Sequence, residues 1–288
     1  MAEIALYLIG AGGKRVRPLV AMAIFRACGG EDPEDITDVA VALELIHSAT
    51  LLHDDIIDGG ETRRGRPSAY VKYGAADTLV AGDFLFSKAF ELCGRFEETV
   101  VRWAAEACIS LTEGEILQAR LRRNLQVTVE DYNEIIRRKT AGLFQQGARV
   151  ASHLAGAEPD VVAELARSGN AIGMAFQIVD DILDVAGDPA ETGKPAGVDL
   201  RDGNPSLPIV LALAESQPLA RVWRLTNPSE ADIELGLAEI RKSGALDRAR
   251  EEAMRHAESA TRGLAIAPGT PYRDFLESLV AELRDRVF

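Results

Sequence analysis

The sequence predicts an all-α protein. Apolar residues recur at three- and four-residue spacing along almost the whole chain, while alternating stretches bounded by turns, which would indicate strands, are scarce. Two long segments, 34–58 and 160–186, are apolar on nearly all sides, as expected for helices surrounded by others at the centre of a bundle. No long linker and no repeat divides the chain, so one domain over residues 1–288 is the simplest organisation.

Glycine, proline and capping residues separate the predicted helices. The breaks CGGEDPED, GAEPD, TNPSE and APGTP combine residues that end a helix with residues that begin one. The predicted helices span residues 16–28, 34–58, 76–93, 97–120, 129–155, 160–186, 206–216, 229–242, 245–264 and 270–286.

Composition and charge exclude several classes of protein. The chain is 47% hydrophobic and 27% charged, which is typical of a folded domain. Its net charge of −13 argues against sequence-independent binding to nucleic acid or anionic lipid, so an anionic ligand would need local cations or a metal. No run approaches the ~18 apolar residues of a transmembrane segment, and residues 1–18 lack the basic region of a signal peptide. Cys28, Cys93 and Cys108 have no metal-like spacing, so we expect a cytoplasmic protein without disulfides.

Both long apolar segments end in aspartates. The first closes with HDDIID, in which Asp54 and Asp58 are four residues apart and therefore project from one face of a helix. The second closes with FQIVDDILD and repeats this spacing with Asp180 and Asp184. Two clusters at the ends of two core helices need a common explanation.

Mg²⁺ binding explains the two clusters best. Three carboxylates within five residues repel one another, and their burial is costly unless cations compensate. One such cluster alone would more often be a solvated helix end, but two favour a metal. Mg²⁺ prefers oxygen ligands and is commonly held by one or two carboxylates together with substrate phosphates. A calcium loop with ligands at alternate positions around a glycine is absent.

Basic residues that could hold a diphosphate occur beside glycines. GGKRVRP supplies Lys14, Arg15 and Arg17, and TRRG supplies Arg63 and Arg64 directly after the first aspartate cluster. Arginine can hold phosphate oxygens with two hydrogen bonds, whereas lysine acts as a point charge. Either turn alone would more often be a solvated basic turn, but the neighbouring aspartates favour an anion site.

Together these motifs resemble the trans-prenyl diphosphate synthases. They follow in that family's order over roughly residues 12–210: GGKRVRP, HDDIIDGGETRRGRP, EGE, KT, FQIVDDILD, TGKP and GVDLRDGNPSLP. The resemblance implies a single-domain helical bundle of the isoprenoid synthase type around a central apolar cavity, and a homodimer. It implies an enzyme that uses Mg²⁺, three ions with substrate bound, to condense isopentenyl diphosphate with an allylic diphosphate (dimethylallyl, geranyl, farnesyl or geranylgeranyl).

The resemblance also implies roles for individual residues. The metal ligands would be Asp54, Asp58, Asp180 and Asp184, supported by Asp55 and Asp181. Isopentenyl diphosphate would be held by Lys14, Arg17, His47 and Arg64. The allylic diphosphate would contact Arg63, Lys139, Thr140, Gln177 and Lys194. The residues that act in catalysis would be Asp54, Asp58, Lys139, Asp180 and Lys194.

Two features depart from the family pattern. Asn204 stands in DLRDGNPSLP where many relatives carry lysine, which leaves one phosphate contact weaker or supplied by another residue. The chain also begins about 11 residues before GGKR, where relatives have a longer helical section, so we expect a helix that stabilises the dimer to be reduced.

Small residues before the first aspartates predict a long product. Ala49 and Thr50 lie five and four residues before Asp54, roughly 6–7.5 Å below it on a helix. Short-chain farnesyl synthases of this family usually carry an aromatic ring there, and HSATLLHDD resembles the long-chain enzymes that make quinone tails. We therefore expect a C30–C40 product. The alternative is a C20 geranylgeranyl product, with the cavity closed lower down by Phe84 or Phe86.

Two further alternatives belong to other functional classes. A terpene cyclase or head-to-head synthase would also use paired acidic motifs, but it would not need the isopentenyl diphosphate residues of GGKRVRP. A regulatory subunit of a heteromeric synthase would be expected to lose aspartates from one cluster, and both clusters are intact here.

Overall fold

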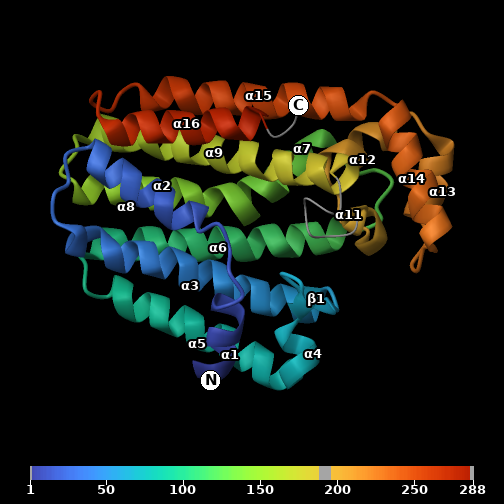
Figure 1. Cartoon of the computed structure of the whole chain (residues 1–288), viewed down its shortest axis with the longest axis horizontal. Helices are drawn as coiled ribbons and strands as arrows, with labels where there is room; N and C mark the ends of the chain where they lie inside the picture. Colours follow the sequence, from blue (N-terminus) through green and yellow to red (C-terminus); the bar gives the residue numbers. More distant parts are fainter. Residues whose placement is uncertain (1, 188–195, 286–288) are drawn as a thin grey trace.

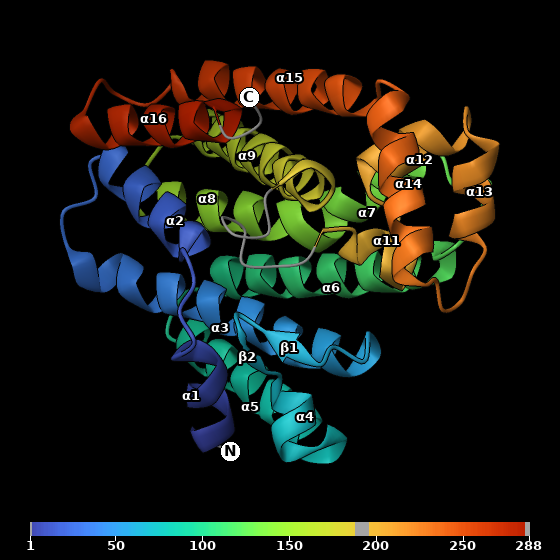
Figure 2. The ribbon, with the colours of Figure 1, turned by 45° about the vertical axis from the view of Figure 1, so that its right-hand side comes forward.

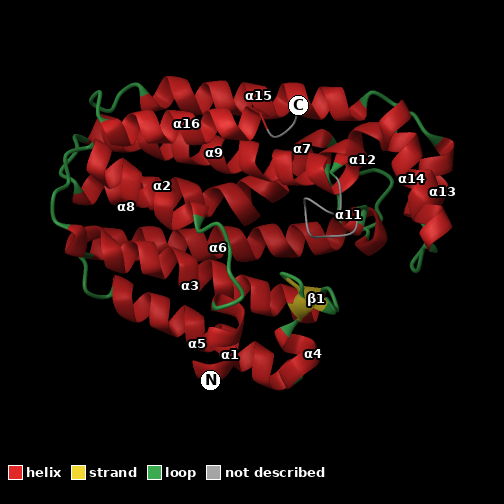
Figure 3. Ribbon diagram, viewed as in Figure 1, coloured by secondary structure: helices red, strands yellow, loops and turns green. Residues whose placement is uncertain are grey.

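The computed structural model describes residues 2–187 and 196–285 and consists of long helices packed in layers (Figure 1). The prediction of an all-α fold is confirmed, since the only sheet in the described residues is the hairpin of β1 (Thr62–Arg63) and β2 (Arg66–Pro67) (Figure 3). The long helices are α2 (Val16–Ala27), α3 (Pro33–Ile57), α5 (Ala75–Cys93), α6 (Glu98–Leu121), α8 (Gly142–Leu154), α9 (Pro159–Ala186), α14 (Glu230–Lys242), α15 (Ala245–Leu264) and α16 (Pro271–Asp285). The short helices are α1 (Ala2–Ile9), α4 (Ala69–Tyr73), α7 (Val129–Ile136), α11 (Val198–Asp202), α12 (Leu207–Leu213) and α13 (Gln217–Trp223).

Helix α3 lies inside the bundle, as its apolar sequence predicts. The Asp32 side chain accepts a hydrogen bond from the Glu34 N–H at 2.9 Å, and Pro33 occupies the first turn, which together fix where the helix begins. The helix packs against α5 on one side and against α2 and α8 on the other. Among the helices that the structure describes, α3 alone is long and apolar enough to cross a membrane, but 56% of its apolar window is buried inside the protein. It is therefore a core helix.

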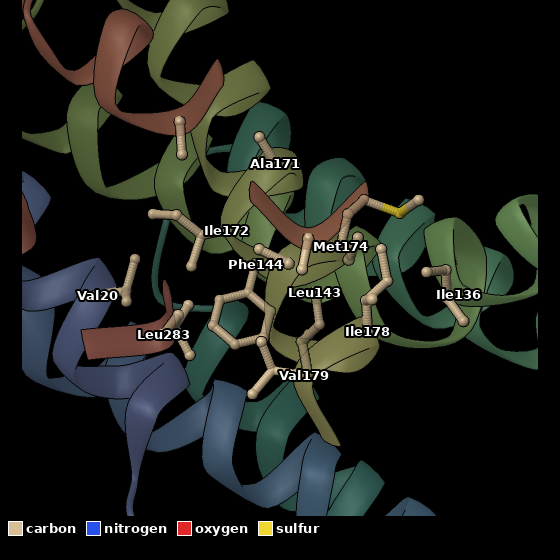
Figure 4. Packing of buried hydrophobic residues seen from close by; sticks show 14 of the residues in the cluster. Val20, Ile136, Leu143, Phe144, Ala171, Ile172, Met174, Ile178, Val179 and Leu283 are labelled. Atoms are coloured by element: carbon tan, nitrogen blue, oxygen red, sulfur yellow. The ribbon is translucent and has the colours of Figure 1, made fainter. Parts of the chain in front are cut away.

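Helices α8 and α9 cross closely because glycines remove side chains at the contact. A Cβ atom on Gly173 would lie 2.5 Å from the Cα of Ala141, and one on Gly169 would lie 2.7 Å from the Phe144 carbonyl oxygen. The Phe144 ring packs in the main core cluster beside Ile172 and Val179 of α9 (Figure 4). This close crossing brings the segment before α8 against the C-terminal half of α9.

The sequence did not predict several short elements. Helix α1 was not expected; its apolar residues form a second core cluster with α3 and α5, and the Tyr7 hydroxyl donates a hydrogen bond to the Pro67 carbonyl at 2.8 Å. Figure 2 shows α1, α4 and α5 together at the bottom of the view, on the side of the bundle opposite α15 and α16. Helices α11 and α13 and the hairpin were also not predicted. These elements are held by tertiary contacts rather than by strong local periodicity.

The predicted helix 129–155 contains an irregular turn. Residues Arg137–Ala141 form a π-helical segment, η1, between α7 and α8. The C-terminal ends of α3, α6 and α9 meet at one end of the bundle beside α11 and β1 (Figure 1). The segment η1 packs against both α6 and α9, so it contributes to the same region.

Candidate functional site

Asp54 faces a lysine from the π-helical turn. The Lys139 Nζ lies 3.9 Å from the Asp54 Oδ2 and also forms an ion pair with Glu115 of α6. Burial raises the pKa of Asp54 to about 6, against the opposing effect of Lys139, and Glu115 and Asp58 raise it further. Burial alone would lower the pKa of Lys139, but Asp54 and Glu115 outweigh it and raise this pKa. Lys139 therefore stays charged beside a carboxyl group that ionises only near neutral pH.

The EGE segment holds this lysine in place. A Cβ atom on Gly114 would lie only 2.7 Å from the Lys139 backbone nitrogen, so glycine is what lets α6 approach the π-helical turn. On either side, Glu113 forms an ion pair with Arg138 and Glu115 with Lys139. Short π-helical turns of this kind are frequent at functional sites. The sequence showed EGE only as part of the family pattern, and the structure gives its physical reason.

The other two aspartates of the first cluster also have one cation each. The buried Asp55 Oδ1 accepts a hydrogen bond from the Arg63 Nε at 2.8 Å and forms an ion pair with the Arg63 Nη2 at 2.6 Å. Asp58 forms an ion pair with Arg122, the residue directly after α6. Asp55 thus acts as an anchor for Arg63.

In the second cluster, Asp181 is a structural carboxylate. Its oxygens accept hydrogen bonds from the Tyr132 hydroxyl at 2.7 Å, the Gln177 amide at 2.8 Å and the Leu207 N–H at 3.2 Å. The Gln177 carbonyl oxygen in turn accepts a hydrogen bond from the Thr140 hydroxyl at 2.9 Å. Burial raises the pKa of Asp181 despite these donors. This chain of hydrogen bonds joins η1, α7 and α9.

Asp180 and Asp184 have different surroundings. Asp180 is exposed, whereas Asp184 accepts hydrogen bonds from the Val198 and Asp199 N–H groups at 3.0 and 3.1 Å and so caps α11. Burial raises the pKa of Asp199 well above its usual value, and Asp184, Asp181, Asp180 and Asp202 raise it further. The end of α9 therefore concentrates negative charge that a cation would relieve.

Arginines surround His47 in what we call the arginine site (Arg15, Arg17, Arg63, Arg64 and His47). Burial lowers the pKa of His47 well below its usual value, and all four arginines lower it further, so the ring is neutral at pH 7. Arg15 is paired with Glu44 and Arg63 with Asp55, so the neutral histidine together with Arg17 and Arg64 is the part of this group best suited to an anion.

Two arginines of this site are oriented by the main chain and by aromatic rings. The Arg17 guanidinium lies 5.0 Å from the centroid of the Phe144 ring, and burial lowers its pKa to about 10 although Glu44 and Asp180 oppose this. Arg64 has a positive φ of 53° and donates to the Gly12 carbonyl oxygen. A Cβ atom on Gly13 would lie 2.9 Å from the Arg64 Nη2, so the GGK glycines allow the two loops to meet. Lys14 lies in that loop and is exposed.

The donor set fits Mg²⁺ held partly by its ligand. In residues 2–187 and 196–285, no three acidic, histidine or cysteine side chains converge as a preformed cage. The carboxylates of Asp54 and Asp58 on α3 and of Asp180 and Asp184 on α9 are instead spread over two helix ends. Mg²⁺ commonly takes one or two carboxylates and completes its shell with water and substrate phosphates.

One predicted residue lies outside the described part of the chain, and some site residues were missed. Lys194 is not described. Sequence reasoning did not select Glu115, Arg122 or Tyr132 individually. Their partners are at least 24 residues away along the chain, so no local pattern could have indicated them.

The chain matches known proteins over nearly its whole length. The family model described as "Polyprenyl synthetase" matches residues 1–235. The octaprenyl diphosphate synthase of Escherichia coli (strain K12) is 34% identical over 291 residues, which cover 99% of this chain and 90% of that protein. The short chain isoprenyl diphosphate synthase of Methanothermobacter thermautotrophicus is 36% identical over 288 residues, which cover 97% of this chain and 88% of that protein. Other relatives at 34% identity are named nonaprenyl diphosphate synthase and heptaprenyl diphosphate synthase component 2.

The fold agrees with a solved structure. The crystal structure of polyprenyl synthase from Caulobacter crescentus CB15, complexed with calcium and isoprenyl diphosphate, superposes with a TM-score of 0.93 at 37% identity. The match covers 100% of this chain and 89% of that one. The fold and the site together define the class of protein. The helical bundle, the paired aspartates and the arginine site are those of a prenyltransferase that acts on diphosphates. The chain belongs to the polyprenyl synthetase family and is a prenyl diphosphate synthase of isoprenoid biosynthesis.

Asp54 gives a prediction for stability and pH. Because folding raises its pKa from 3.8 to about 6, the folded protein binds this proton more tightly than the unfolded chain. The stability that the folded protein gains from binding this proton is fully present below pH 3.8 and is lost as pH rises through about 6. The shift of about two pKa units corresponds to roughly 3 kcal/mol. Asp54→Asn should therefore raise the Tm of the metal-free protein at pH 7.5, by less at pH 5, while lowering kcat by on the order of 10²–10³-fold.

Differential scanning calorimetry between pH 5 and pH 7.5 tests this stability effect. Glu234→Gln is the matched control, because it removes one negative charge from an exposed position of α14. A lower Tm for Asp54→Asn than for the unmodified protein at pH 7.5 would show that the carboxylate stabilises the metal-free fold.

Proposed function

We propose that this enzyme condenses isopentenyl diphosphate with an allylic diphosphate to make an all-trans polyprenyl diphosphate of C30–C40. The observation that carries this proposal is that the two aspartate clusters and the arginine site come together near the ends of α3 and α9, while an apolar cavity lies further back along α3, beside Val39, Leu43 and Ile46. The charged groups suit a diphosphate head, and the apolar residues along α3 suit a hydrocarbon tail. The allylic substrate is dimethylallyl, geranyl, farnesyl or geranylgeranyl diphosphate.

The allylic diphosphate belongs at the aspartate clusters. We assign Asp54, Asp58, Asp180 and Asp184 as the ligands of three Mg²⁺ ions. We assign Lys139, which pairs with Asp54, to the departing diphosphate oxygens. Thr140 and Gln177 already share a hydrogen bond, so they would contact the diphosphate as a unit. Arg63, held by Asp55, and Lys194 complete the group in this proposal.

Isopentenyl diphosphate belongs at the arginine site. Of this site, Arg17, His47 and Arg64 would hold it together with the neighbouring Lys14, and these residues come from α2, α3 and the loops before α2 and between β1 and β2. Arg17 is near enough to Asp180 for the carboxylate to raise the pKa of its guanidinium, so the two diphosphate positions are adjacent. Adjacent positions are what a reaction between two bound diphosphates requires.

The reaction follows from this placement. When bound, Mg²⁺ would neutralise charge on the departing diphosphate. The carbon–oxygen bond of the allylic substrate breaks, and the diphosphate leaves with the bonding electrons, assisted by the Lys139 ammonium. The double bond of isopentenyl diphosphate then attacks the allylic carbon, and the proton lost from the adjacent carbon passes to a diphosphate oxygen. Apolar side chains below the site exclude water from the cation.

A narrow apolar cavity lies along α3 below the aspartates. It has a free volume of about 30 Å³, about the space of one water molecule, so the helices or side chains must move as a tail grows. Ile46, Leu43 and Val39 of α3 line one side of it. The rest of the lining is mostly small or flexible, with Ala42, Cys93, Val100, Ala104, Ala107, Leu143, Gln146, Gly147 and Val150. Small residues favour a cavity that can open.

The two candidate residues for tail length have different positions. Thr50 is four residues from both Asp54 and Ile46, so it lies on the face of α3 that leads from the metal ligands to the cavity. Ala49 is fully buried in the second core cluster with Ala81 and Leu85 of α5. A large residue at position 49 would therefore act on the cavity only by displacing α5. We propose Thr50 as the more direct of the two.

A homodimer is the proposed assembly. Leu79 and Phe90 on α5 are 11 residues apart and therefore share a helix face, and Ile109 and Ile116 on α6 are 7 apart and do the same. All four side chains are at least 40% exposed, which is unusual for large apolar residues that have no partner. We propose that a second copy covers them in a cytoplasmic dimer. Light scattering should give twice the 31.0 kDa of one chain, and a monomer at micromolar concentration would contradict this.

The product assay tests the proposed function. The purified protein is given farnesyl diphosphate, excess isopentenyl diphosphate and Mg²⁺, and the products are separated by chain length. We expect C30–C40 products, in line with the octaprenyl name of the Escherichia coli relative. A product no longer than C20 would support the geranylgeranyl alternative. No turnover of isopentenyl diphosphate by the isolated chain would favour a cyclase or one component of a heteromeric synthase.

A substitution at Thr50 tests the path of the tail. Thr50→Phe should place a ring between Asp54 and Ile46 and shorten the main product to C20 or less, with dimethylallyl diphosphate still accepted as the primer. Thr50→Val is the control of similar size. An unchanged product length in Thr50→Phe would mean that the tail leaves the aspartates along another face of α3.

A further inference from the structure

Arg122 joins the two halves of the site. Its Nε donates a hydrogen bond to the Asn204 Oδ1 at 2.9 Å, and its Nη2 forms an ion pair with Asp58. Asn204 is buried, whereas the Arg122 and Asp58 side chains are 24% and 19% exposed. The guanidinium thus reaches from the loop after α11 to the end of α3, with one edge fixed and the other at the margin of the site.

The main chain around Arg122 is held firmly. The next residue, Arg123, has a positive φ of 54°, and its backbone N–H donates to the Gly203 carbonyl at 3.0 Å. The Arg123 Nη2 donates to the Arg201 carbonyl at 2.6 Å, and a Cβ atom on Gly203 would lie 2.5 Å from the Arg123 Cγ. The turn after α6 is therefore fastened to the loop that carries Asn204. Arg122 is positioned by the fold rather than by chance contact at the surface.

The charges near Arg122 favour a role in binding. Asp58 and the half-buried Asp202 both interact electrostatically with it, so one guanidinium serves two carboxylates. If Asp58 ligates a divalent cation, that cation replaces Arg122 as the partner of Asp58 and repels the Arg122 guanidinium. An arginine has five N–H donors, and only the Nε is needed by Asn204. The two Nη groups are then available to an anion that arrives with the metal.

We propose that Arg122 is a substrate-binding residue. Its guanidinium keeps the hydrogen bond to Asn204 and rotates, so that its Nη groups leave Asp58 and bind the oxygens of the metal-bound diphosphate. This inference rests on the proposed function. It accounts for Asn204 at a position where lysine was expected from the family pattern, since the positive charge comes from residue 122 instead and Asn204 orients it. A lysine at 204 would place its ammonium beside this guanidinium, so the two cations are alternatives.

Calorimetric binding of inorganic pyrophosphate in the presence of Mg²⁺ tests the proposal without turnover. Arg122→Gln should weaken pyrophosphate binding roughly 10- to 100-fold, the effect of losing one or two hydrogen bonds between charged groups. Arg120→Gln removes the same charge two residues earlier, from an exposed position on α6, and should bind like the unmodified protein. The double variant Arg122→Gln/Asn204→Lys should regain at least about tenfold of the lost affinity.

The outcomes separate this proposal from the proposed function. If the unmodified protein binds no pyrophosphate with Mg²⁺ and consumes no isopentenyl diphosphate, the proposed function itself fails. If it does both, and Arg122→Gln binds pyrophosphate equally well while only its Tm falls, then Arg122 is a structural contact and the present inference is wrong. Equal weakening by Arg120→Gln would also overturn it, because the effect would then be general electrostatics. Circular dichroism of each variant shows that it is folded.

Discussion

The neutralisation of three carboxylates at the end of one buried helix is the interaction on which this structure depends. Asp54, Asp55 and Asp58 each face a different cation, and these cations come from η1, from β1 and from the residue after α6. An unpaired carboxylate in such a place would be strongly unfavourable. The segments that surround the site are therefore positioned by the same charges that the chemistry uses.

In the second cluster, Asp181 and Asp184 are held by neutral hydrogen-bond donors instead of by cations. Asp181 takes its hydrogen bonds from a tyrosine, an amide and a main-chain N–H, and Asp184 takes two main-chain N–H groups at the start of α11. These donors lower the pKa of Asp181, but burial outweighs them and raises it to about 7. The first cluster is thus paired with cations before a ligand arrives, while the acidic groups near the end of α9 attract divalent cations.

Periodicity and motif order predicted the fold class, the main helices and the aspartate clusters. They could do so because each of these features depends on residues that are only a few positions apart in the sequence. Arg122 could not be found in this way, since its partners Asp58 and Asn204 are 64 and 82 residues distant. His47 looked like a core histidine and was selected only by resemblance; its surrounding arginines became visible only once the loops were in place. Spacing also could not distinguish Thr50 from Ala49, because the direction of each side chain depends on where α5 packs.

The apolar character of α3 has a consequence for synthesis on the ribosome. Its partner α8 begins 85 residues after α3 ends, which at about 5–20 residues per second means a delay of roughly 4–17 s. During that time part of a helix apolar enough to resemble a membrane span would be exposed to solvent. Helix α5 begins only 18 residues after α3 ends, and it packs along α3. Packing of α5 against α3 would therefore cover part of this apolar surface before α8 has emerged.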